Sequence, residues 1–163
     1  VVTVINPGVI LGIGFWDSGS GQLFTQIANG LPFFTKGTTG FVCINDVVKC
    51  MILSMKNQMN GARFIVVAEN ISYEEMVKMI ALALKVKLPN IYAKPWMTSI
   101  YLRIDAMLAF VLGRKRLMSK SVARSLHQKT AYSSKKIKSE LGFQFQDIEE
   151  CIIEIAKNYP HKK

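Results

Sequence analysis

Side chains that commonly perform catalysis are sparse in this chain of 163 residues, and their spacing matches no common catalytic motif. The two histidines, His127 and His161, are far apart and form no metal-ligand cluster. The carboxylates lack the spacing of a paired acid and base, and Asp46 is better interpreted as a helix N-cap. No segment matches the phosphate-binding loops GxxxxGKS/T and GxGxxG, the nucleophile elbow GxSxG or the zinc motif HExxH. The residues alone therefore identify no reaction.

The three cysteines, Cys43, Cys50 and Cys151, are widely separated in the sequence. They form no CxxC pair and no disulfide framework. The pattern predicts small buried thiols in a reducing compartment, and we expect a cytoplasmic protein.

The net charge of +10 is unevenly distributed. Basic and acidic residues balance over residues 1–84, with five of each, so residues 85–163 carry the whole excess. A basic helical module over residues 95–163 that binds nucleic acid is one interpretation. Those residues lack the interleaved aromatic side chains of a base-stacking surface, and lysines on solvated helix faces are the favoured interpretation. We therefore expect no nucleic-acid partner.

A membrane partner is not expected either. The longest apolar stretch, residues 100–112, is interrupted by Arg103 and Asp105 and is too short to span a bilayer. No signal peptide is visible at the start of the chain.

Two apolar, β-branched runs, residues 1–5 and 63–67, have the composition of strands buried on both faces, and we expect them to pair in parallel. The chain opens on the first of these runs, without a methionine. We therefore expect it to be cut from a longer protein, and to expose an apolar sheet edge around Val2, Val4, Ile65 and Val67.

The order of strand, loop and helix predicts an α/β fold. Helices are expected over residues 21–28, after Asp46, from a capping box of Ser72 and Glu75, from Pro95 to about 112, and after Ser119, Ser133 or Ser134, and Asp147. Residues 33–44 are expected to form a hairpin in a separate small layer, and residues 90–92 a short strand.

Four segments in series resemble a known family. Residues 3–14, TVINPGVILGIG, resemble the sixth strand and the R/N-P-x-x-V/I-x-G-P-G turn of extended short-chain dehydrogenases/reductases. Residues 41–48, FVCINDVV, resemble their F-V/I-H-V-x-D-V-A segment, and residues 64–75 their returning strand, loop and S-x-x-E stretch. Residues 132–143, YSSKKIKSELGF, resemble the late D-x-S-K-A-x-x-E-L-G-F helix. The chain is similar to the NAD-dependent epimerase/dehydratase family, with most likeness to its dihydroflavonol-4-reductase-like and 3β-hydroxysteroid-dehydrogenase-like branch.

The resemblance implies the C-terminal half of such an enzyme: the C-terminal part of a Rossmann-type parallel sheet plus a small, mostly helical substrate-binding domain. Residues 1–12 and 60–87 would be the last strands and helix of the Rossmann-type domain, and residues 13–59 and 88–163 the substrate-binding domain. The Gly-rich loop and the catalytic Tyr-x-x-x-Lys pair would lie in a missing N-terminal half. We therefore expect no catalytic residue here and no activity of this chain alone.

One tyrosine and lysine, Tyr132 and Lys136, do have the catalytic spacing. They fall in the late C-terminal helix region of the resemblance rather than on the helix before the sixth strand. We interpret the match as chance.

The resemblance also implies a cofactor site for NAD or NADP. The turn of Pro7, Gly8, Val9 and Ile10 would place its backbone against the nicotinamide carboxamide. The alternative is an ordinary turn between a strand and a loop.

A small-molecule substrate, oxidised or reduced at a hydroxyl or carbonyl by hydride transfer, would contact Asn6, Phe15, Trp16 and Phe41. Phe15 and Trp16 are candidates for an apolar pocket wall, and equally for a loop anchor on the core. The resemblance implies that the missing N-terminal half of the same protein is the partner of this chain, and that the full-length protein forms a homodimer in some members.

Two positions depart from the family. Thr39 stands where sugar-nucleotide epimerases usually carry an arginine for the diphosphate, which weakens a nucleotide-sugar substrate. Cys43 replaces the usual histidine, which we interpret as a packing change. A non-catalytic NAD(P)-binding sensor or scaffold stays open as an alternative.

Overall fold

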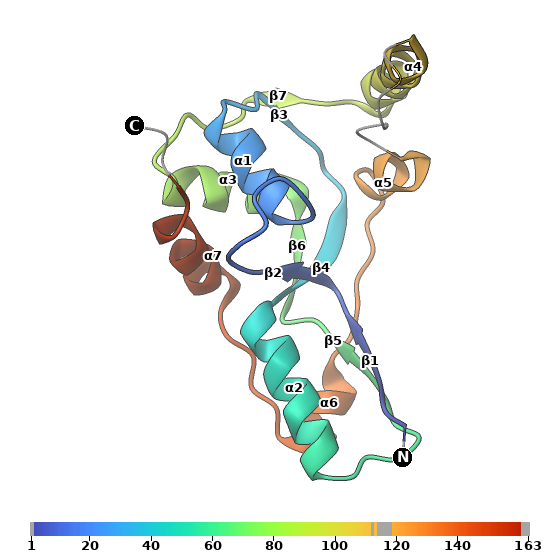
Figure 1. Ribbon diagram of the computed structural model, residues 1–163, viewed down its shortest axis with the longest axis vertical. Helices are drawn as coiled ribbons and strands as arrows, with labels where there is room; N and C mark the ends of the chain where they lie inside the picture. Colours follow the sequence, from blue (N-terminus) through green and yellow to red (C-terminus); the bar gives the residue numbers. More distant parts are fainter. Residues whose placement is uncertain (1, 112, 114–118, 161–163) are drawn as a thin grey trace.

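The computed structural model describes residues 2–111, 113 and 119–160 (Figure 1). The expected basic loop at residues 114–116, the helix end at residue 112 and His161 lie outside the described residues. The strands are β1 (Val4–Pro7), β2 (Val9–Leu11), β3 (Phe33–Phe34), β4 (Thr38–Cys43), β5 (Arg63–Val66), β6 (Glu69–Ser72) and β7 (Ile91–Tyr92). The helices are α1 (Gly21–Ala28), α2 (Ile44–Lys56), α3 (Tyr73–Ala83), α4 (Pro95–Val111), α5 (Lys120–Ser125), α6 (Lys135–Leu141) and α7 (Ile148–Lys157).

The two apolar runs pair in parallel, as predicted. Val4 of β1 lies opposite Arg63 of β5, and Pro7 opposite Val66. Val2 is exposed and Val4 and Ile65 partly so, which confirms that part of the predicted apolar surface, whereas Val67 is buried and was wrongly included.

The predicted hairpin over residues 33–44 is wrong. β4 pairs in parallel with β2 and antiparallel with β6, while β3 pairs in parallel with β7. Gly37, within this segment, allows two backbones to approach, since its N–H donates to the Leu126 carbonyl and an added Cβ would lie 2.4 Å from that oxygen. The chain therefore does not reverse direction here, and β3 and β4 belong to different sheets.

Two hydrophobic clusters stabilise the fold. The upper one in Figure 1 joins β2, β4 and β6 to α1, α3 and α7, around Phe24, Phe41 and Ile152. The lower one joins β5 to α2 and α6, around Phe64 and Ile137. Elements of both predicted domains share each cluster, so the boundaries proposed from the resemblance stay a prediction.

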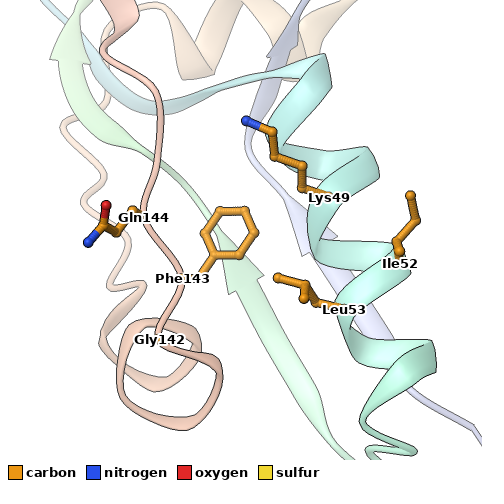
Figure 2. Close-up of a pocket in the computed structure, with 6 residues that line it drawn as sticks. All are labelled: Lys49, Ile52, Leu53, Gly142, Phe143 and Gln144. Carbon is orange, nitrogen blue, oxygen red and sulfur yellow. The ribbon is translucent and has the colours of Figure 1, made fainter.

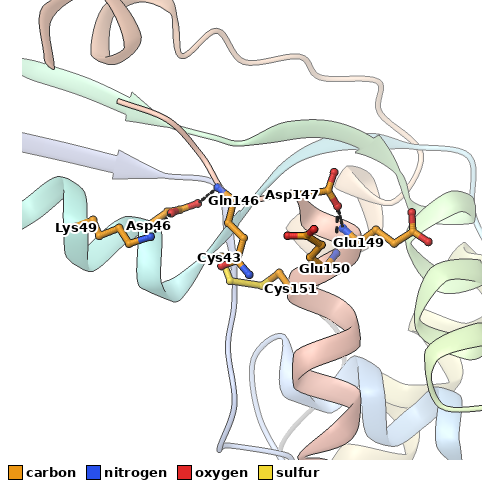
Figure 3. The surroundings of a disulfide bond; sticks show 8 residues. All are labelled: Cys43, Asp46, Lys49, Gln146, Asp147, Glu149, Glu150 and Cys151. Atoms are coloured by element: carbon orange, nitrogen blue, oxygen red, sulfur yellow. Dashed lines mark hydrogen bonds and ion pairs between the residues drawn. A yellow bond between two sulfur atoms is a disulfide. The ribbon is translucent and has the colours of Figure 1, made fainter. Parts of the chain in front are cut away.

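Most helix ends follow the local sequence. Ser72 and Glu75 form the predicted capping box at α3, Asp147 accepts two N–H groups at the start of α7, and Gly142 ends α6 in the left-handed conformation. The expectation for Asp46 is wrong, because α2 begins earlier, at Ile44. Its buried carboxylate instead accepts the N–H of Gln146 at 2.8 Å, with the Lys49 ammonium 3.6 Å away (Figure 3).

The prediction of three thiols is also wrong. Cys43, at the end of β4, and Cys151, in α7, form a disulfide across 108 residues of sequence (Figure 3). Cys50 is a buried free thiol. Pairs so distant in sequence leave no local pattern, and the bond removes the cysteine argument for a reducing compartment.

Candidate functional site

The carboxyl ends of β1 and β5 meet at a closely packed pair of glycines. The Gly8 N–H donates to the Val66 carbonyl at 3.1 Å and so continues the pairing of the strands. A Cβ on Gly8 would lie 2.4 Å from the Gly40 carbonyl oxygen, and one on Gly40 would lie 2.6 Å from a Val67 methyl. Only residues without a side chain allow the ends of β1 and β5 to come this close to the middle of β4.

A segment from the other end of the sequence braces this edge. The Ser134 hydroxyl accepts the Val67 N–H at 3.0 Å and donates to the Val67 carbonyl at 2.7 Å. Beside it, the Asn70 side chain donates to the Tyr132 carbonyl at 2.9 Å and accepts the Tyr132 N–H at 2.8 Å. Sequence reasoning missed both braces. Ser134 was interpreted only as one of two possible helix caps, and its hydroxyl makes no capping bond.

The proposed cofactor turn is placed between the two clusters. Pro7 is exposed at the end of β1. The Val9 side chain packs on the upper cluster and the Ile10 side chain on the lower one. These side chains are therefore structural, and a ligand at this turn would meet backbone atoms of residues 7–10 and the exposed Asn6.

The proposed substrate residues have three different environments. Phe15 is 85% exposed, in the loop after β2. Trp16 is a loop anchor, because its ring packs edge-on against Tyr159 and Phe24 and its carbonyl accepts the Thr25 hydroxyl at 2.8 Å. Phe41 is only 1% exposed, inside the core, so its side chain does not face solvent.

The titratable groups near this edge form no catalytic pair. Tyr132 precedes α6, while the Lys136 ammonium of that helix lies 5.3 Å from the centre of the Phe64 ring, which agrees with a chance match of spacing. Burial raises the pKa of Tyr73, partly offset by a hydrogen bond with Ser125, so this phenol stays protonated at neutral pH. Within the described residues, no three potential metal ligands come together.

Two shallow pockets border the segment after α6. Figure 2 shows the first, of about 310 Å³, where Leu53 of α2 points toward Phe143, and Lys49 and Ile52 of the same helix complete the lining. The second, of about 530 Å³, lies on the other side of this segment and reaches Ala68 and Glu69. Neither pocket is lined by a residue of the turn over residues 7–10.

Comparison with known proteins identifies the fold. No protein-family model and no curated protein matches this sequence. Solved structures that resemble it include gox2253 (20% identity, TM-score 0.73, 96% of this chain and 48% of that chain). A nucleoside-diphosphate-sugar epimerase from Pseudomonas aeruginosa, PA4631, gives 16% identity, a TM-score of 0.72 and coverage of 96% and 47%. The human epimerase family protein SDR39U1, isoform 2, with NADPH, gives 20% identity, a TM-score of 0.68 and coverage of 96% and 48%. This chain spans about half the length of each of these structures and shares their α/β fold over nearly all of its own residues.

Proposed function

We propose that this chain is part of an NAD(P)-dependent oxidoreductase or epimerase, in which it supplies the last strands of a Rossmann-type sheet and the substrate-binding domain. One observation carries the proposal: the parallel pair of β1 and β5, whose carboxyl ends meet at Gly8 and Val67, in a fold similar to that of a protein whose structure contains NADPH. In open α/β sheets, ligands bind beyond the carboxyl ends of the strands.

The edge proposed for the cofactor is open to solvent. Asn6 and Pro7 are exposed at the end of β1, and β5 is the one strand that pairs with β1 within the described residues. We assign the backbone of residues 7–10 to the nicotinamide carboxamide, and Asn6 and Phe15 to the substrate. When bound, the nicotinamide supplies or accepts the hydride. This chain would orient it and exclude water from it.

The catalytic tyrosine and the dinucleotide-binding loop are assigned to a further half of the sheet, placed beside the free edge of β1. The proposed boundaries follow: residues 1–12 and 60–87 extend the Rossmann-type domain, and residues 13–59 and 88–163 cover the substrate. Within the family we favour the dihydroflavonol-4-reductase-like branch. Thr39, in the position of the usual diphosphate-binding arginine, argues against a nucleotide-sugar substrate.

The test is binding and turnover of NADH and NADPH by the protein expressed from its complete coding region, with a panel of aldehydes, ketones and secondary alcohols. We expect one dinucleotide to bind and one substrate class to turn over, while the 163-residue chain alone shows no activity. Phe15→Ala should raise KM for that substrate with an unchanged melting temperature. Leu82→Ala, which truncates an exposed apolar side chain of α3 outside the proposed substrate-covering residues, is the control and should leave KM unchanged. Binding without turnover would identify a sensor, and no binding of either dinucleotide would refute the proposal.

A further inference from the structure

Helix α4 exposes a broad apolar surface. Its side chains at three- and four-residue intervals on the outer side are apolar and exposed, with Trp96 and Met107 each 61% exposed. We define this outward stripe by its six exposed apolar residues: Trp96, Ile100, Tyr101, Ile104, Met107 and Leu108. In a helix of a soluble domain, such a stripe normally faces the core.

The opposite side of α4 faces the protein and buries two polar residues beside Ala109. Asp105 is only 2% exposed, and Thr98 is buried with its hydroxyl 2.8 Å from the Nε2 atom of His127, just after α5. Asp105 was one of two charges that argued against a membrane partner in the sequence. Because it is turned inward, Arg103 is the one charged side chain of α4 that reaches solvent.

The position of α4 sets it apart from the strand edge at which the second half of the sheet is proposed to pair. α4 lies at an outer corner of the molecule, joined to the body beside α5, whereas β1, β5 and α2 lie at the other end (Figure 1). The free edge of β1 and α4 therefore lie at opposite ends of the molecule.

The charges near α4 indicate the kind of partner that covers the outward stripe. Between residues 76 and 139 the one acidic residue is the buried Asp105. Lys94, Arg103 and Arg124 are exposed on α4, immediately before it and on α5. A second copy of the chain would bring like charges together, whereas anionic lipid headgroups complement them. Trp96 and Tyr101 add the aromatic side chains that favour the boundary between headgroups and acyl chains.

We propose that α4 is an interfacial anchor that lays its outward stripe on an anionic lipid bilayer. At 17 residues the helix is about 25 Å long, shorter than the roughly 30 Å of a bilayer core. Among the described residues no helix is long and apolar enough to cross a membrane, so α4 lies in the surface plane. A bound membrane would bring apolar substrates to the protein from the lipid phase.

The experiment is cosedimentation of the full chain with vesicles of phosphatidylcholine alone and of phosphatidylcholine with one-quarter phosphatidylglycerol. We expect pelleting only with the anionic vesicles, and its loss at high salt. The paired variant Ile104→Glu with Met107→Glu should bind at least tenfold more weakly. The matched control, Met51→Glu with Met55→Glu, changes two exposed methionines of α2 and should bind as the wild type does.

Tryptophan fluorescence gives a second measurement of vesicle binding that does not depend on sedimentation. In a Trp16→Phe background Trp96 is the one tryptophan, and its emission should shift to shorter wavelength with anionic vesicles alone. An equal loss of vesicle binding in the α4 and α2 double-glutamate variants would overturn the proposal, and so would the absence of binding to anionic vesicles. A dimer in sedimentation velocity that the α4 pair dissolves, without vesicle binding, would overturn it in favour of a second copy of the chain.

Discussion

Removal of one hydroxyl tests whether the C-terminal segment holds the proposed site together. Ser134→Ala deletes the oxygen that accepts the Val67 N–H and donates to the Val67 carbonyl. Both Ser134 and Val67 are buried, so water does not replace the lost partner without rearrangement. The backbone at the carboxyl end of β5 would then carry two unsatisfied polar groups.

The expected loss of stability follows from the two unsatisfied groups, the N–H and the carbonyl of Val67. A buried donor or acceptor left without a partner costs about 1–3 kcal/mol, so we expect Ser134→Ala to lower the free energy of unfolding by about 2–4 kcal/mol. Loss of a helix cap is not the cause, because the Ser134 side chain makes no capping bond to α6. A domain of this size is stable by about 5–15 kcal/mol, so the variant still folds.

The assay is urea denaturation followed by circular dichroism, with amide exchange at Val67 as the local readout. Ser133→Ala, one residue earlier and exposed, is the matched control and should change stability by less than about 0.5 kcal/mol. Ser134→Thr keeps a hydroxyl and should restore slow exchange at Val67. Equal stability of the two alanine variants, with unchanged exchange at Val67, would show that the Ser134 hydroxyl does not stabilise the end of β5.

Further expected outcomes concern the disulfide, the glycine contact and pH. Cys151→Ser should lower the free energy of unfolding by about 2–4 kcal/mol, and thiol titration of the denatured, unreduced wild type should find one free thiol per chain. Gly8→Ala should cost about 1–3 kcal/mol, because its Cβ would meet the Gly40 carbonyl oxygen, and a melting temperature equal to that of wild type would contradict this contact. Burial lowers the pKa of His127, so its neutral form is favoured in the folded state. The stability it contributes is present above its ordinary pKa of about 6.5 and is lost as pH falls below that value. Thr98→Val should not remove this pH dependence, whereas His127→Gln should, as measured by unfolding between pH 7.5 and 5.5.

Local sequence patterns predicted the features of the fold that depend on residues close together in the sequence. The two parallel strands were found because strands buried on both faces read as continuous β-branched runs, and the capping box of Ser72 and Glu75 because its spacing is local. The same logic failed at Gly37, because a glycine that permits close contact between backbones looks the same in sequence as one that permits a turn.

Long-range pairings could not be predicted in this way. The disulfide joins residues 108 apart, and Asp46 bonds a backbone group 100 residues away. For Trp16 the sequence allowed a pocket wall or an anchor, and its contact with Tyr159, near the other end of the chain, decides for the anchor. The candidate site was predicted as a turn, but the Ser134 brace that holds it is a tertiary contact.

Two exposed apolar helix faces among the described residues call for different partners, and their neighbouring elements separate them. The stripe on α2 comprises Ile44, Val48, Met51, Ile52 and Met55, and it lies at the same end as the free edge of β1 (Figure 1). Residues 1–84 carry no net charge, although Lys49 and Lys56 are exposed on α2 and its one acidic residue, Asp46, is buried. A strand edge beside an apolar helix face is complementary to another strand and its covering helices, which is what the proposed second half of the sheet supplies. The outward stripe of α4 lies away from that edge, in the part of the sequence with the excess of basic charge, and Lys94, Arg103 and Arg124 are exposed on or near it. Those features suit lipid better than protein. If both assignments hold, the second half should protect the α2 stripe from hydrogen exchange and oxidation, and leave α4 free to bind anionic vesicles.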